Sequence, residues 1–106
     1  MAKYMVKVKY TQDGLKGLLK DGGTARVEAV NQLLKSVGGT VESFYFAFGA
    51  EDGFVVLDVP DVVSAAALSL TVGAAGGASV EVIQLLTPAE IDAASKKSPA
   101  YRAPGQ

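Results

Sequence analysis

Hydrophobic and polar residues alternate along several segments of the chain, and this alternation predicts four β-strands. The first segment is the clearest: from Lys3 to Tyr10 every second residue is Tyr or Val, with lysines and one methionine between them. Side chains of a strand alternate between two faces, so this strand has one apolar and one largely cationic face. The other predicted strands are Val41–Phe48, Phe54–Val59 and Ser79–Leu86.

The middle two strands are expected to form a hairpin around which the rest of the chain is organised. Both are rich in aromatic and β-branched residues, which favour a pleated, half-buried surface. Gly49 and Gly53 bracket a short polar tip, which is typical of a hairpin loop. Pro60 cannot donate to a strand ladder, so the second strand of the hairpin ends before it.

Apolar residues at helical spacing predict two main helices and one short one. The main helices are Ala25–Val37, with Arg26 on its polar face, and Val62–Ala75, which starts at a capping aspartate. The short helix starts at Thr87, followed by the proline and glutamate of a capping box, and runs to about Lys97. Thr11–Gly23 is expected to be a connector with one or two helical turns.

The order strand, helix, strand, strand, helix, strand predicts an α+β fold of the ferredoxin-like split βαβ (βαββαβ) type. A four-stranded antiparallel sheet would carry both main helices on one face, with the first and third strands central and adjacent. Residues 1–97 would form this domain, with the extra short helix at its end. Residues 98–106 would be an extended C-terminal tail, either disordered or lying along a neighbouring subunit.

Such a sheet leaves its second face uncovered, and the alternation indicates which residues lie there. The helix side should receive the uniformly apolar set, and the open face should receive Met5, Lys7, Lys9, Val56 and Asp58. Continuity with the hairpin places Phe44, Phe46 and Phe48 on the open face as well. Exposed apolar patches of this kind usually mark an interface. The same face of a second copy would cover it and give a dimeric α+β barrel.

Candidate ligand-binding residues follow from this open face. Lys7 and Asp58 would lie on adjacent central strands, either as a register-fixing or solvated ion pair, or as an anion anchor or proton donor oriented by a carboxylate. Aromatic side chains would shape an apolar site around them. The candidates are Lys7, Lys9, Phe44, Tyr45, Phe46 and Asp58.

Composition narrows the chemistry that the chain could perform. It has 106 residues, a formal net charge of -1, and neither Cys nor His. Cys/His zinc sites, Cys or His haem ligation and His-dependent catalytic triads are therefore excluded. Glu51 and Asp52 in the hairpin tip resemble metal ligands but are more often turn residues. We expect no cofactor and no metal.

The same composition bears on partners and compartment. A balanced charge argues against broad nucleic-acid binding, which needs clustered Lys and Arg. No apolar run without polar breaks reaches membrane-spanning length, and the N-terminus lacks the apolar region of a signal peptide. A chain without cysteine fits a reducing cytosol, so a cytoplasmic location is expected.

Several segments together resemble the GYD domain family. They are Tyr4–Tyr10, Gly14–Leu19, Gly38–Gly39, Ser43–Gly49, Leu57–Asp61, Val63–Leu68, Leu85–Glu90, Lys96–Ser98 and Tyr101–Arg102. As an ordered set they cover nearly the whole chain. The motif that names the family is altered, because Glu51 occupies the position of its tyrosine and Gly53 is inserted. The resemblance implies a ferredoxin-like, dimeric α+β barrel in small bacterial proteins, and no established activity.

Two functions remain open at this point. One is a self-associating domain that binds a small hydrophobic or anionic ligand on the open sheet face. The alternative is a small cofactor-independent enzyme, of the oxygenase or isomerase type, with its site inside the barrel. A sheet of this topology can also bind RNA, but the aromatic RNP pattern is missing and Asp58 would repel phosphate.

Overall fold

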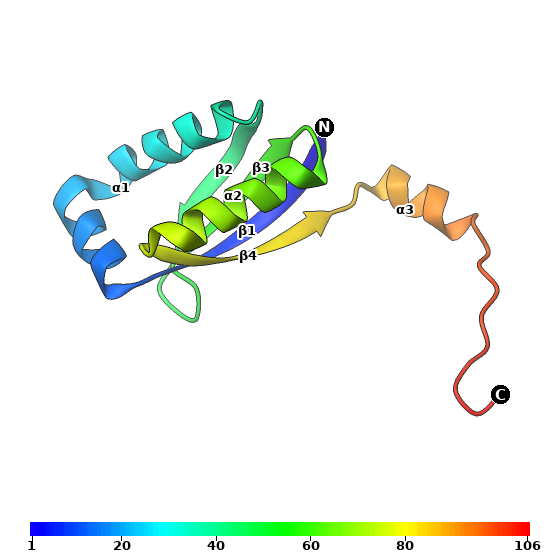
Figure 1. Ribbon diagram of the computed structural model, residues 1–106. Coiled ribbons are helices and arrows are strands. Elements are labelled where there is room, and N and C mark those ends of the chain that lie inside the picture. The colour runs from blue at the N-terminus through cyan, green and yellow to red at the C-terminus, as the bar shows by residue number, and fades with distance from the viewer.

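The computed structural model describes residues 1–106, which form seven elements (Figure 1). In chain order they are β1 (Ala2–Tyr10), α1 (Gln12–Lys35), β2 (Thr40–Phe46), β3 (Gly53–Val59), α2 (Val62–Ala75), β4 (Ala78–Leu85) and α3 (Pro88–Ser95). The predicted order of strands and helices is confirmed. Most of the predicted boundaries of the strands and of α2 lie within one or two residues of the boundaries in the structure.

The four strands form one antiparallel sheet of order β2-β3-β1-β4. As predicted, the first and third strands are the central pair. Helices α1 and α2 lie on the same side of this sheet, and the other side carries no helix (Figure 1). The protein therefore has the predicted α+β, ferredoxin-like architecture.

The core lies between the sheet and the two helices. Alternate residues of the central strands point into it, among them Tyr4, Val8, Val55, Leu57 and Val59, which are all buried. The helices contribute Leu34 of α1 and the pair Ala65 and Leu68 of α2. Each fully buried Val or Leu stabilises the fold by about 1.5 to 3 kcal/mol relative to an exposed one. The predicted phase of the two central strands is thus confirmed.

The predicted phase of β2 is wrong beyond its third residue, because the strand contains a β-bulge. The register runs from Val41 opposite Leu57 to Ser43 opposite Val56, which leaves Glu42 as an extra residue. One extra residue exchanges the two faces of a strand for every position after it. Phe44 and Phe46 therefore lie on the helix side, where Phe44 lines the interhelical space and Phe46 lies against Gly23. Phe48 lies in the loop after β2 and is fully exposed.

Helix α1 begins earlier than predicted, because the expected connector is itself helical. The side chain of Thr11 accepts a hydrogen bond from the N–H of Gly14 and caps the helix. A break follows at Gly22, whose φ of 82° and ψ of 171° are not helical. Only glycine adopts this φ readily, so the helix is kinked near the predicted end of the Thr11–Gly23 connector. Figure 1 shows the two halves of α1 meeting at an angle there.

The segment after β4 projects away from the rest of the molecule (Figure 1). We call residues 86–106, which comprise α3 and the tail, the C-terminal arm. Every residue of this arm from Leu86 to Arg102 is exposed. The radius of gyration is 16.9 Å, whereas a compact chain of this length has about 13 Å. The projecting arm accounts for this difference.

Candidate functional site

The open face of the sheet is the surface that carries most of the predicted site residues. The strand register places its side chains in rows that run across the sheet. The middle row consists of Ser43, Val56, Met5 and Ile83, and it is apolar apart from the serine on the edge strand β2. The next row towards the hairpin is Tyr45, Phe54, Lys7 and Glu81. Tyr45 is largely exposed, at 72%, so an aromatic ring and a lysine border the apolar row.

The row on the other side is an ion-pair cluster centred on Lys3. Nζ of Lys3 lies 2.9 Å from Oε1 of Glu42 and 3.2 Å from both carboxylate oxygens of Asp58. The hydrogen bonds that Lys3 donates, first to Glu42 and then to Asp58, raise the pKa of Lys3 above its ordinary value of 10.5. The bulge in β2 places Glu42 beside this cluster. Lys3 is therefore held as a charged link between three strands.

This cluster corrects the predicted partnership of Lys7 with Asp58. The β1–β3 register places Asp58 opposite Lys3 and Lys7 opposite Phe54. Alternation assigned both residues to the open face correctly, but alternation does not fix how far one strand slides along the other. Asp58 therefore belongs to an ion pair, which is one of the two interpretations that the sequence analysis gave for it. Its partner is Lys3, however, and not Lys7.

Lys9 is tied to the hairpin loop. Its Nζ lies 3.4 Å from Oδ1 of Asp52, and Oδ2 of the same carboxylate accepts a hydrogen bond from the N–H of Tyr10 at 2.8 Å. The N–H of Asp52 in turn donates to the carbonyl of Val8 at 2.8 Å. Asp52 thus fastens the loop to β1. No group of three potential metal-ligating side chains is found in the structure.

Lys7 differs from the other two lysines of β1 because no carboxylate lies within 4.0 Å of its ammonium group. Its neighbours across the strands are Phe54 on one side and Glu81 on the other. Of the predicted ligand-binding residues, the structure brings Lys7 and Tyr45 together on the open face. It places Lys9 and Asp58 in ion pairs on the same face and removes Phe44 and Phe46 to the helix side.

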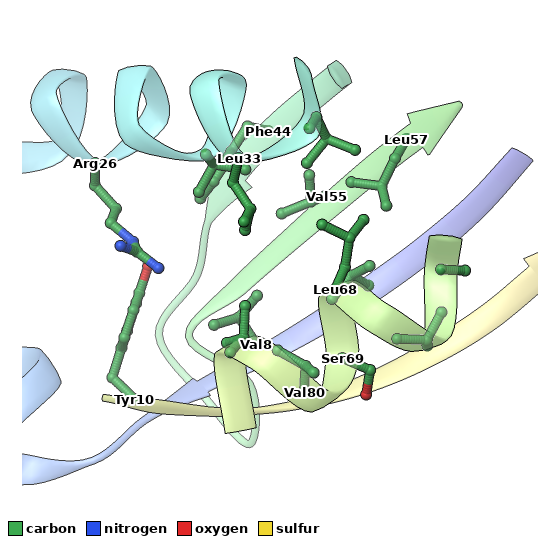
Figure 2. Close-up of a pocket in the computed structure, with 16 residues that line it drawn as sticks. Val8, Tyr10, Arg26, Leu33, Phe44, Val55, Leu57, Leu68, Ser69 and Val80 are labelled. Atoms are coloured by element: carbon green, nitrogen blue, oxygen red, sulfur yellow. The ribbon is translucent and has the colours of Figure 1, made fainter. Parts of the chain in front are cut away.

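Two adjoining clefts that share lining residues lie on the helix side, between α1 and α2, and Figure 2 shows the residues that line the smaller one. The outer cleft has a volume of about 500 Å³, and the inner one is a narrow slot of about 60 Å³ with almost entirely apolar walls. Four residues line both: Tyr10, Arg26, Leu33 and Val72. Figure 2 shows Arg26 reaching from α1 towards the sheet and Tyr10 reaching back from the end of β1.

Sequence reasoning missed Arg26, which was assigned to the polar face of its helix. In the structure its Nε atom is buried and has no hydrogen-bond partner. The position of Arg26 along the helix did not indicate this location, because helical spacing shows which face of α1 is polar but not that a gap lies between α1 and α2. No helix of the structure combines the length and the apolar composition needed to span a membrane.

The architecture defines the class of the protein: an α+β sandwich of the ferredoxin-like type, open on one side of its sheet. A sequence model of the GYD domain matches residues 4–95, and the chain belongs to the GYD domain family. This match runs from β1 to the last residue of α3. Comparison with curated proteins and with solved structures found no match.

Proposed function

We propose that this protein is a self-associating domain that forms a homodimer through the open face of its sheet. The observation that carries the proposal is the apolar part of the middle row, Val56, Met5 and Ile83, to which Phe54 and Tyr45 add aromatic surface. An apolar patch framed by polar groups is the usual composition of a protein interface. The membership in the GYD domain family agrees with this proposal without naming an activity.

The charges around the apolar row support a partner of the same kind. The open face carries three lysines, and carboxylates are interspersed among them at Glu42, Asp58 and Glu81. In a twofold dimer the same patch meets itself, so both signs of charge must be present on it. A strongly acidic or basic partner would match this surface poorly, whereas a second copy matches it well.

The C-terminal arm supports the same proposal independently. It exposes Leu86, Ile91 and Tyr101, at 58%, 51% and 79% respectively, and its helix packs on no face of its own domain. Apolar residues of an arm that projects this far can reach a neighbouring subunit. We therefore expect the arm of each copy to lie along its partner. For residues 98–106 this is one of the two alternatives that the sequence analysis left open.

Analytical ultracentrifugation of the full chain tests this proposal. The wild-type protein should sediment as a dimer at micromolar concentration, and Met5→Asp should sediment as a monomer, because it places a charge in the centre of the apolar row. Leu19→Asp is the matched control, since Leu19 is 87% exposed on α1, away from the sheet, and it should remain dimeric. A monomeric wild type, or a Met5→Asp variant that still dimerises, would contradict the proposal.

Lys7 supports a finer proposal, that the covered face binds a small hydrophobic or anionic ligand. Phe54 lies opposite Lys7 on β3 and Glu81 lies opposite it on β4, and no carboxylate is within 4.0 Å of its ammonium group. An unpaired cation beside apolar surface attracts an anion once a second copy excludes water. The alternative function, a cofactor-independent oxygenase or isomerase, would use the same lysine. Lys7→Met should weaken binding of a small aromatic carboxylate, and unchanged affinity would contradict this part.

A further inference from the structure

The geometry points to a second binding site, in the cleft between α1 and α2, which takes a small molecule with an anionic head and an apolar body. This site lies on the opposite side of the sheet from the open face. It is independent of the proposed dimer, because none of its lining residues belongs to the open face.

The cleft has the size and the chemical character of a ligand site. Its outer part has a volume of about 500 Å³, and small-molecule sites usually measure about 300 to 1,000 Å³. The inner slot is lined by apolar side chains from the sheet and both helices, including Val30, Leu68 and Val80. Such sites are mostly apolar with a few polar groups that fix the orientation of the ligand. Arg26 and Tyr10 supply those groups where the two parts meet.

The electrostatics of Arg26 indicate the charge of the ligand. Its Nε is buried without a partner, and no carboxylate of the chain lies within 4.0 Å of the guanidinium group. The residue as a whole is half-buried, but its Nε–H is a buried donor without a partner, and such a donor is costly. A carboxylate would accept hydrogen bonds from the guanidinium group and remove this cost, and the planar donors of arginine suit it well. Asp21, which lines only the outer cleft, would repel an anion there, so an anionic head is expected beside Arg26.

Tyr10 gives the head group a second contact. The residue is buried, at 7% exposed, and lines both parts of the cleft. Figure 2 shows its hydroxyl directed towards the end of Arg26. A phenol can donate one hydrogen bond to a carboxylate, so the two side chains could hold one anionic head from two sides. The apolar body of the ligand would then enter the slot between Leu33 and Val72.

Three probes of equal length test this inference by isothermal titration calorimetry on the full chain. They are 4-phenylbutyrate, the neutral 4-phenylbutan-1-ol and the cationic 4-phenylbutylamine. We expect 4-phenylbutyrate to bind and the other two to bind about tenfold more weakly or worse, as the loss of a charge-assisted hydrogen bond requires. Equal binding of the alcohol, or absence of binding by all three, would overturn the inference.

Variants locate the site and separate it from the open face. Arg26→Met keeps most of the side-chain volume and should weaken 4-phenylbutyrate binding about tenfold or more, with Lys20→Met on the exposed surface of α1 as the matched control. Tyr10→Phe should weaken it less. If Lys7→Met abolishes binding and Arg26→Met does not, the cleft inference is overturned and the ligand part of the proposed function is supported.

An NMR experiment on the wild-type protein tests the same inference without depending on whether a variant folds. The side-chain Nε–H resonance of Arg26 should shift as 4-phenylbutyrate is added, and nuclear Overhauser contacts should join the phenyl ring to Leu33 and Val72. A resonance that stays in place while the ligand binds would overturn the inference. Contacts to the arm of a second copy in place of the probe would also overturn it, because the cleft would then be a protein contact.

Discussion

Lys3 and Asp58 lie directly opposite each other on the two central strands, and Nζ of Lys3 is 3.2 Å from both carboxylate oxygens of Asp58. Glu42 reaches the same ammonium group from the bulge in β2, at 2.9 Å. One lysine thus connects three of the four strands at one end of the sheet. The cluster therefore joins the central pair of strands to the bulge in β2.

The stability of the protein should depend on the charge of Lys3 at alkaline pH. Hydrogen bonds to Glu42 and then Asp58 raise the pKa of Lys3 above 10.5 in the folded state. Its contribution is therefore complete below the unfolded value and is lost as the pH rises through the raised value. Lys3→Met should lower the free energy of unfolding at neutral pH, and its difference from the wild type should shrink at alkaline pH. Urea denaturation across this range measures the effect, and a difference independent of pH would contradict it.

The N-terminal cap of α2 should give the opposite dependence, at acid pH. Oδ1 of Asp61 accepts a hydrogen bond from the N–H of Ser64 at 2.8 Å, and this bond is the main cause that lowers the pKa of Asp61 below 3.8. A lowered pKa contributes stability above the unfolded value, which is lost as the pH falls through the folded value.

Asp61→Ala should accordingly reduce the melting temperature at neutral pH and approach the wild type in strong acid. Asp61→Asn keeps a capping oxygen without the charge, so it should lose less stability than alanine while losing the pH dependence. Thermal denaturation followed by circular dichroism compares the three proteins. If the two variants behave alike at every pH, the cap does not act as described.

Two glycines of α1 should respond oppositely to alanine. A Cβ at Gly14 would overlap the carbonyl oxygen of Gly77, to which the N–H of Thr11 also donates at 3.1 Å. Gly14→Ala should therefore destabilise the protein by about 1 to 3 kcal/mol, as overpacking does. A Cβ at Gly17 would meet nothing within 4 Å, so Gly17→Ala should stabilise the helix by about 0.5 to 1 kcal/mol. Urea denaturation measures the free energy of unfolding of both variants. A change of the same sign in the two would contradict this prediction.

Helix α3 should depend on its own cap and on little else. The side chain of Thr87 accepts from the N–H of Glu90 at 3.2 Å, and the carboxylate of Glu90 accepts from the N–H of Thr87 at 2.9 Å. Thr87→Ala should cost about 1 kcal/mol of helix stability. Carbon chemical shifts of residues 88–95 should then move towards coil values while the melting temperature of the domain stays the same. A lower melting temperature would show that α3 packs on the domain and would contradict this prediction. Asp92→Asn, which leaves the cap intact, is the control.

Local signals explain what the sequence predicted well. Tyr4 and Val8 were assigned to the core because alternation along β1 is strict, and both are buried. The starts of α2 and α3 were predicted because Asp61 and Thr87 carry their signals within three residues. Strand order followed from the order of elements, since right-handed connections leave few topologies.

Features that depend on pairs of distant residues were not predictable in this way. The bulge at Glu42 is defined by how β2 meets β3, and it reversed the predicted faces of Phe44 and Phe46. The partner of Asp58 depended on strand register, and the role of Arg26 on the space between two helices. Pro60 and the glycines marked where elements end, but no such local marker exists for the position of a bulge.

The projecting arm has a consequence for proteolysis. Lys96, Lys97 and Arg102 are exposed on a segment without packing partners in its own domain, whereas the lysines of β1 are in the hydrogen-bonded sheet. Trypsin should therefore trim the arm long before it digests the sheet. If two copies hold each other's arms, this trimming will slow as the protein concentration rises, so the cleavage rate at Lys96 becomes a direct gauge of assembly.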